Sequence, residues 1–192
     1  MAFIQIEHSD NFAIRLNQMT AFEYCNHYLI KFTLDTCSYV NHPELYRKNI
    51  SISNVDDCNG MGFSVVRMKN YLLKQSDHMR GYVYYNRIDN KPVGCVWVAY
   101  KGANEFQYRI RKIDAFGFDF AVNNAYRGQG IVGFMIYELL LTLKNEGINV
   151  LYASVRKDNR SALKAYDKTG AVIVESKRFF RVSGIRIPYP II

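Results

Sequence analysis

The 192-residue sequence has few of the residues that cross-link or punctuate a chain. It holds four cysteines and four prolines. No two cysteines form a C-x-x-C pair and no histidine stands at a zinc-ligand spacing from them; they are Cys25, Cys37, Cys58 and Cys95. Free thiols in a reducing cytosol are favoured over a disulfide pair, and no metal is expected. Because no repeat or Pro/Ser-rich linker divides the chain, we expect one domain over residues 1–192.

The sequence also lacks a long apolar run. The most apolar stretch lies between Arg127 and Lys144. Glu138 interrupts it, and it is shorter than the roughly 18 apolar residues that a membrane span needs. The first residues lack the basic start and the apolar run of a secretory signal. These absences predict a cytoplasmic protein without a membrane-spanning helix.

Acidic residues are fewer than basic ones. Lys and Arg number 25 against 17 Asp and Glu, a formal net charge of +8. Residues 1–100 hold 10 basic and 9 acidic residues, whereas residues 101–192 hold 15 and 8. An anionic partner is therefore expected to meet the C-terminal half. Nucleic acid is not favoured, because no basic run with interleaved aromatic residues forms a recognisable binding motif.

The N-terminal part of the chain gives weak structural signals. A strand is expected over 12–18, followed by Thr20, which suits the N-cap of a helix that ends at about Leu34. Residues 35–60 have a loop-like composition. A second helix is expected over 63–74, because apolar residues form a helical stripe there.

From Gly81 onward the pattern is easier to interpret. Two β-rich runs around a short turn segment predict an antiparallel hairpin over 81–100. Alternating elements follow: a strand over 113–122, a helix over 131–143 closed by Gly147, a strand over 148–155, a helix over 159–169 closed by Gly170, and a strand over 171–175 with which 179–187 could pair. This order indicates an α+β fold with mixed layers on one sheet.

Strict alternation makes a further prediction for the strand over 113–122. It places one set of apolar side chains together on one face, namely Phe116, Phe118, Phe120 and Val122. Asp119 is then expected on the opposite face of the strand.

A glycine-rich turn after that strand carries the clearest chemical signal. It reads Val122-Asn-Asn-Ala-Tyr-Arg127-Gly128-Gln129-Gly130-Ile-Val132-Gly133. Glycines let backbone N–H groups converge, and the following helix N-terminus and Arg127 add positive charge, so the turn suits a pyrophosphate. The glycine spacing also matches a dinucleotide fingerprint. That interpretation is disfavoured, because the first glycine lies far from the strand and no acidic residue lies about 20 positions further on.

The same residues resemble a known family. The segment from Val122 to Gly130 is similar to the acyl-CoA signature Q/R-x-x-G-x-G/A of the GCN5-related N-acetyltransferases, the GNAT superfamily. A second block, Asn159-Arg-Ser-Ala162-Leu-Lys-Ala-Tyr166-Asp-Lys-Thr-Gly170, resembles the family's N-x-x-A-x-x-x-Y-x-x-x-G segment. The resemblance covers about residues 81–176. It implies a central mixed, mostly antiparallel sheet flanked by helices.

The resemblance also divides the single domain into three parts. Residues 1–80 form an acceptor-side part, residues 81–176 an acyl-CoA-binding core, and residues 177–192 a C-terminal strand or tail. In the core, the resemblance implies that the Val122 backbone contacts the pantetheine arm of an acyl-CoA. It implies that the pyrophosphate lies in a cradle formed by Arg127, Gly128, Gln129 and Gly130.

Three cofactor-site residues need separate comment. Val132 stands where the family usually has Gly or Ala, but its N–H is still available as a donor. Asn159 is implied at the cofactor site, yet it is also well placed as the N-cap of its own helix. Arg127 has the alternative of a solvated loop arginine.

Tyr166 is the catalytic candidate. At helical spacing Asn159, Ala162 and Tyr166 share one face, and the resemblance implies that the Tyr166 hydroxyl protonates the leaving thiolate. The alternative is that Tyr166 only packs against the sheet. A general base is also needed, and Asp119 is a candidate by position without being assigned.

The function implied is transfer of an acetyl or other acyl group from acetyl-CoA to a primary amine by direct attack, with a backbone N–H near Val122 stabilising the oxyanion. The acceptor is a small molecule or amino sugar, and the basic tail over 178–192 would suit an anionic or nucleotide-linked one. Homodimer formation is left open. Two alternatives are a non-catalytic acyl-CoA-binding module on the same fold and, less favoured, a nucleic-acid-binding protein.

Overall fold

The protein is built on one large sheet. The computed structural model describes residues 22–62, 64–74, 77–103, 110–112, 114–182 and 185–188. Its strands are β1 (Phe22–Phe32), β2 (Leu45–Asn49), β3 (Met79–Asn86), β4 (Pro92–Ala99), β5 (Asp114–Val122), β6 (Val150–Arg156), β7 (Val172–Val182) and β8 (Ile185–Pro188). All eight form a single sheet in the order β2-β3-β4-β5-β6-β1-β7-β8.

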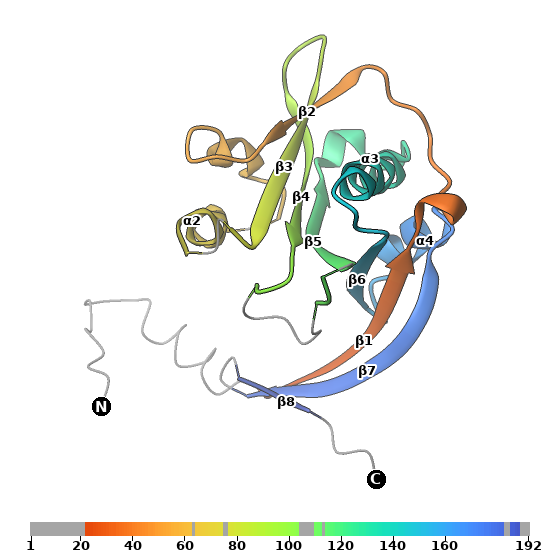
Figure 1. The fold of residues 1–192 in the computed structure, drawn as a ribbon. Helices are drawn as coiled ribbons and strands as arrows, with labels where there is room; N and C mark the ends of the chain where they lie inside the picture. The colour runs from red at the N-terminus through yellow and green to blue at the C-terminus, as the bar shows by residue number, and fades with distance from the viewer. Residues whose placement is uncertain are drawn as a thin grey trace, which may run out of the picture.

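Helices cover both faces of this sheet. They are α2 (Val65–Lys74), α3 (Ile131–Asn145) and α4 (Arg160–Asp167), with short 3-10 helices η1 (Leu34–Thr36), η2 (Val55–Cys58) and η3 (Asn124–Tyr126). Figure 1 shows α3 and α4 on one side of the sheet and α2 on the other. Two buried clusters match these layers: one contains side chains of α3 and the other contains side chains of α2 and η2. The expected α+β layout is confirmed.

The strand directions also agree with the expectation. Among the described strands, every neighbouring pair is antiparallel except β5 and β6. That parallel pair is joined by α3, since parallel strands need a crossover connection. Helix α3 ends as the sequence predicts: Gly147 has a positive φ of 77°, and the Ile148 N–H donates to the Leu143 carbonyl at 2.8 Å.

The N-terminal helix prediction is wrong. Residues 22–32 form β1, which lies between β6 and β7 and is antiparallel to both. Leu29 packs in the α2-side cluster, whereas Ile30 and Phe32 pack in the α3-side cluster. This segment is a strand because both of its neighbours supply ladder partners from the far end of the chain, a tertiary effect that overrides local propensity. The strand expected over 12–18 and the cap at Thr20 lie outside the described residues.

Other elements agree more closely. The helix expected over 63–74, the 81–100 hairpin and the alternating elements after it are confirmed within a few residues. The loop expected over 35–60 contains the edge strand β2, paired with β3. The last strand is longer than expected, since 179–182 continue β7 and pair with β8. None of the helices in the described segments is long and apolar enough to cross a membrane.

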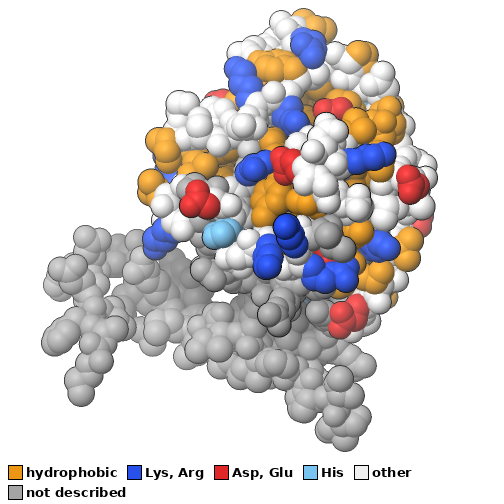
Figure 2. All heavy atoms as spheres, viewed as in Figure 1, with side chains coloured by type: hydrophobic (Ala, Val, Ile, Leu, Met, Phe, Trp, Pro, Cys, Tyr) orange, Lys and Arg blue, Asp and Glu red, His pale blue; other side chains and the backbone are white. Residues whose placement is uncertain are grey.

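Charged side chains are dispersed over the face seen in Figure 2. Lys and Arg side chains are spread across it, with Asp and Glu side chains between them. Basic side chains on this face are therefore not confined to one part of it.

Candidate active site

The centre of the site is an irregularity in β5. Trp97 pairs with Phe118 and Cys95 pairs with Ala121, so β5 has one more residue than β4 between these pairs. Asp119 lies in this interval with a positive φ of 50°. The irregularity is a β-bulge, which bends the strand and changes the direction of the side chains that follow.

The bulge overturns the prediction of strict alternation. Phe116 and Phe118 pack against the α2-side cluster, whereas Phe120 and Val122 belong with the α3-side cluster. Asp119 forms an ion pair with Arg67 of α2, so it reaches the same side of the sheet as Phe118. The four apolar residues therefore do not share one face, because the extra residue shifts the two-residue period by one.

Gly117 leaves room for the bulge. A Cβ at this position would lie 2.8 Å from the ring of Phe120, which folds back over the glycine. The parallel pairing of β5 with β6 also stops here, since its last pair is Gly117 with Ala153. Beyond this point β6 pairs only with β1 among the described strands. The parallel ladder of β5 and β6 therefore ends just before the bulge.

The glycine-rich turn has the conformation that its glycines predict. Gly128 and Gly130 have φ values of 82° and 83°, in the left-handed region that favours glycine. Gly130 is the N-cap residue of α3 and provides no side-chain cap. A Cβ on Gly128 would meet nothing within 4 Å, so the turn is open to solvent on that side. The first N–H groups of α3 are therefore available to an anion.

Arg127 is anchored to the end of β5. Its Nε donates to the Val122 carbonyl at 3.2 Å. The residue is exposed, and the hydrogen bond holds its guanidinium beside the turn. The predicted cradle residues Arg127, Gly128, Gln129 and Gly130 are thus consecutive at the N-terminus of α3, with Val122 joined to them by this bond.

The next two residues of α3 have different surroundings. Val132 is half-buried and packs against the α3-side core. A Cβ on Gly133 would lie 3.2 Å from the side chain of Thr169, so this glycine permits the close approach of α3 to the end of α4. The third glycine of the dinucleotide-like spacing therefore has a packing role.

His42 holds the turn from the N-terminal part of the chain. Its ring is 7% exposed, its Nε2 donates to the Gln129 carbonyl at 2.9 Å, and its Nδ1 lies 2.7 Å from Oε1 of Glu44. The hydrogen bond from His42 lowers the pKa of Glu44. Nothing in the sequence indicated this role, because 87 residues separate His42 from Gln129.

Helix α4 carries the second predicted block. The Asn159 side chain accepts a hydrogen bond from the Ala162 N–H at 3.1 Å, so its N-cap role is confirmed. Tyr166 is 6% exposed. Its ring packs edge-on against Phe32 of β1 and Phe120 of β5, with centroids 5.3 and 6.0 Å apart. Tyr166 therefore lies beside the part of β5 that follows the bulge.

Burial raises the pKa of Tyr166, so its hydroxyl stays protonated and can donate. Burial also raises the pKa of Asp119, whose side chain is 11% exposed, and Arg67 opposes this effect from 3.6 Å. Oδ2 of Asp119 has no hydrogen-bond partner among the described residues. The bulge thus has a protonated phenol on its α4 side and a carboxylate with a raised pKa on its α2 side. Within the described residues, no cluster of His, Cys, Asp or Glu could hold a metal ion.

A comparison with models of protein families identifies the family of this chain. The family model described as "Acetyltransferase (GNAT) family" matches residues 55–171. The chain belongs to the GNAT family. The match spans the bulge, the glycine-rich turn and α4, so it contains both blocks on which the resemblance was based. No curated protein matches the sequence significantly.

Solved structures show the same GNAT fold. A functionally unknown conserved protein from Staphylococcus epidermidis has a TM-score of 0.63 at 14% identity, over 91% of this chain and 68% of its own. A GNAT-family acetyltransferase from Colwellia psychrerythraea has a TM-score of 0.59 at 15% identity, over 86% of this chain and 58% of its own. A glucosamine N-acetyltransferase region of a fungal multi-domain β-N-acetylglucosaminidase scores 0.58 at 12% identity, over 88% of this chain and 22% of its own. This chain thus spans only part of each neighbour, and at these identities the likeness shows the fold alone.

The raised pKa of Asp119 predicts that the stability of the folded protein depends on pH. A raised folded-state pKa means that folding favours the protonated carboxyl, so ionisation opposes folding as the pH rises through that pKa. Asp119→Asn removes the ionisation and suits the left-handed φ. We expect the variant to gain stability relative to the wild type between pH 4 and neutral pH, measured by urea unfolding. A difference that does not vary with pH would contradict the raised pKa.

Proposed function

We propose that the protein transfers an acetyl group from acetyl-CoA to a primary amine of a small molecule. The observation that carries this proposal is the uncapped, glycine-opened N-terminus of α3 beside the end of the β5–β6 ladder. Family membership supports the same chemistry. In the reaction a C–N bond forms, the thioester C–S bond breaks, the amine loses a proton and the departing thiolate gains one.

The turn at Gly128–Gly130 would bind the pyrophosphate of CoA. Backbone N–H groups at the start of α3 point away from the helix, where the helix dipole favours negative charge. Arg127 adds a full positive charge, and its bond to the Val122 carbonyl keeps it there. Asn159 acts indirectly in this proposal: as a cap it orders the first turn of α4 and leaves Tyr166 on the inward face.

Tyr166 would protonate the departing thiolate. Its hydroxyl is held in a buried aromatic environment by Phe32 and Phe120, and burial keeps it protonated until the transfer step. The backbone at Val122 is available to orient the pantetheine arm, because the β5–β6 ladder ends before it.

Asp119 would accept the proton of the attacking amine, directly or through water. A base is more effective when its pKa lies closer to the working pH, and burial raises the pKa of this carboxylate. Since Asp119 reaches α2, the acceptor would approach from the α2 side and the thioester from the α4 side. The acceptor would be a small amine or an amino sugar, and it could also carry an anionic group.

Acetyl-CoA should stabilise the folded protein. At a concentration about 100-fold above Kd the gain is about 2.7 kcal/mol, which for a chain of this size raises Tm by about 5 to 10 °C. Arg127→Glu should abolish the shift, whereas Lys74→Glu, an exposed charge reversal on α2, should retain it. An absent wild-type shift, or an unchanged shift in Arg127→Glu, would refute the cradle.

Tyr166→Phe tests the acid. The substitution keeps the ring contacts with Phe32 and Phe120 and removes only the hydroxyl. We expect kcat, followed by thiol release with an amine panel, to fall about 100-fold. The acetyl-CoA-induced Tm shift should remain. If turnover is unaffected, Tyr166 is a packing residue; if the wild type binds acetyl-CoA but acetylates no amine, the chain is a binding module.

Asp119→Asn tests the base through the pH profile. Because the base must be ionised, wild-type kcat should rise with pH through the raised pKa of Asp119. The variant should be slower and lose this rise. An acidic limb that survives the substitution would assign the base to another group.

A further inference from the structure

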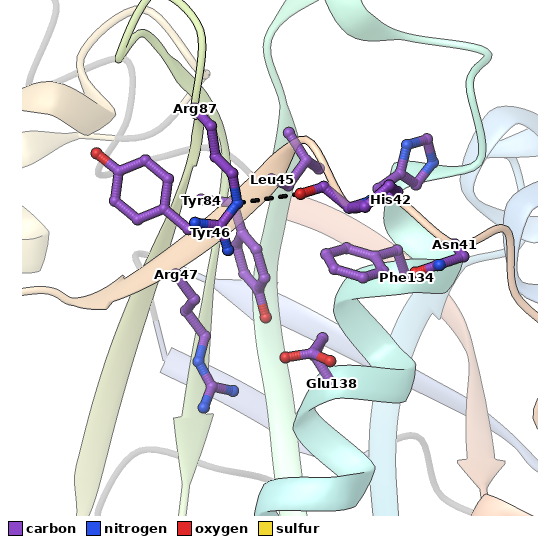
Figure 3. A pocket seen from close by; sticks show the side chains of 10 residues that line it. Asn41, His42, Leu45, Tyr46, Arg47, Tyr84, Arg87, Phe134 and Glu138 are labelled. Atoms are coloured by element: carbon purple, nitrogen blue, oxygen red, sulfur yellow. Dashed lines mark hydrogen bonds between the residues drawn. The ribbon is translucent and has the colours of Figure 1, made fainter.

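A pocket lies on the other side of α3 from Tyr166, between this helix and the strands β2 and β3. Its volume is about 460 Å³, within the range of small-molecule sites. Figure 3 shows the side chains that surround it. Apart from His42, which borders both regions, its lining contains none of the residues proposed to act on acetyl-CoA.

Strand register brings the first two polar groups together. Arg47 of β2 pairs directly with Tyr84 of β3, so both side chains point to the α3 side of the sheet. The Arg47 guanidinium lies over the Tyr82 ring, 4.6 Å from its centroid, and its Nη1 donates to Thr142 Oγ1 at 2.9 Å. No carboxylate of the described residues lies within ion-pair distance of Arg47.

Tyr84 is the unexplained group. Its side chain is completely buried, and its hydroxyl has no hydrogen-bond partner among the described residues. Burial raises the pKa of Tyr84 while Arg47 opposes this, and the hydroxyl remains a protonated donor. Figure 3 shows the hydroxyl directed toward the space between Arg47 and Glu138. A buried hydroxyl without a partner is unfavourable for the stability of the folded protein.

Helix α3 supplies the opposite charge. Phe134, Glu138 and Thr142 recur every four residues and so form one stripe, which faces the strands through the Phe134–Tyr84 ring contact and the Arg47–Thr142 bond. Glu138 has no ion-pair partner within the described part of the chain. A charge of each sign therefore borders the same space without being neutralised by its own neighbours.

A second arginine lies at the other end of the pocket. The Nε of Arg87 donates to the Pro43 carbonyl at 3.0 Å, and its guanidinium lies 5.6 Å from the centroid of Tyr46. These contacts fix the guanidinium, and no carboxylate among the residues that the structure describes lies within ion-pair distance of it. Arg47 and Arg87 against Glu138 give the lining an excess of positive charge.

We propose that this pocket binds a small zwitterion of the α-amino acid class. Its carboxylate would pair with an arginine, and its ammonium group would pair with Glu138. A purely anionic ligand would meet Glu138 unfavourably, and a purely cationic ligand would meet two arginines. Only a ligand with both charges pairs favourably with groups of both signs.

The test is calorimetric titration of the full chain with matched sets of probes. Each set contains an L-α-amino acid, the amine obtained by removing its carboxylate, and the acid obtained by removing its amine; inorganic phosphate is added as a plain anion. We expect at least one amino acid to bind more tightly than both of its matched analogues and phosphate. Equal binding of the acid or of phosphate would overturn the zwitterion, and no binding by any amino acid would overturn the site.

Substitutions then locate the binding. Arg47→Gln and Glu138→Gln should each raise Kd about tenfold or more, while Arg80→Gln, a β3 arginine paired with Glu146 outside the pocket, should leave it unchanged. Tyr84→Phe should raise the Tm of the free protein, because it removes an unpartnered buried hydroxyl. Unchanged affinity in Arg47→Gln or in Glu138→Gln would contradict the proposal.

Discussion

The bulge at Asp119 is the constraint on which the site depends. One extra residue in β5 ends its parallel ladder with β6 at Gly117. The same residue reverses the direction of the side chains that follow, so that Phe120 joins Tyr166 on one side of the sheet while Asp119 reaches α2 on the other. A regular strand would have placed these groups differently. The two distinct chemical environments therefore have a single cause.

The glycine-rich turn depends on residues remote from it in the sequence. His42 binds the Gln129 carbonyl, and a Cβ on Gly130 would lie 3.0 Å from Val40, so the segment before β2 packs closely against the turn. A single buried hydrogen bond contributes only about 1 kcal/mol to stability. The bond from His42 matters mainly for position, because it fixes the backbone of the glycine-rich turn. Without it, that backbone would be held only by its own short-range hydrogen bonds. The N-terminal part, which carries neither family motif, thus helps to support the core motif.

Helix α3 has three environments along its length. Its N-terminus is open and polar, its inward side fills the main apolar cluster, and the stripe containing Glu138 faces the polar pocket beside β2. This division explains why the helix is nearly apolar in sequence yet borders both the glycine-rich turn and the pocket. Basic side chains are spread over the face shown in Figure 2, while Arg127 lies beside the turn and Arg47 lines the pocket.

The sequence by itself determined the features that rest on short-range physics. Glycines at 128 and 130 mark left-handed backbone, Asn159 marks a helix start, and apolar periodicity marks α3, because each signal acts within about four residues. Tertiary structure decided the rest. The segment 22–32 is a strand because β6 and β7 pair with it from more than a hundred residues away, and the bulge and the His42–Gln129 bond likewise depend on partners distant in the chain. Pairings of this kind leave no local pattern, since each requires a contact that only the folded chain creates.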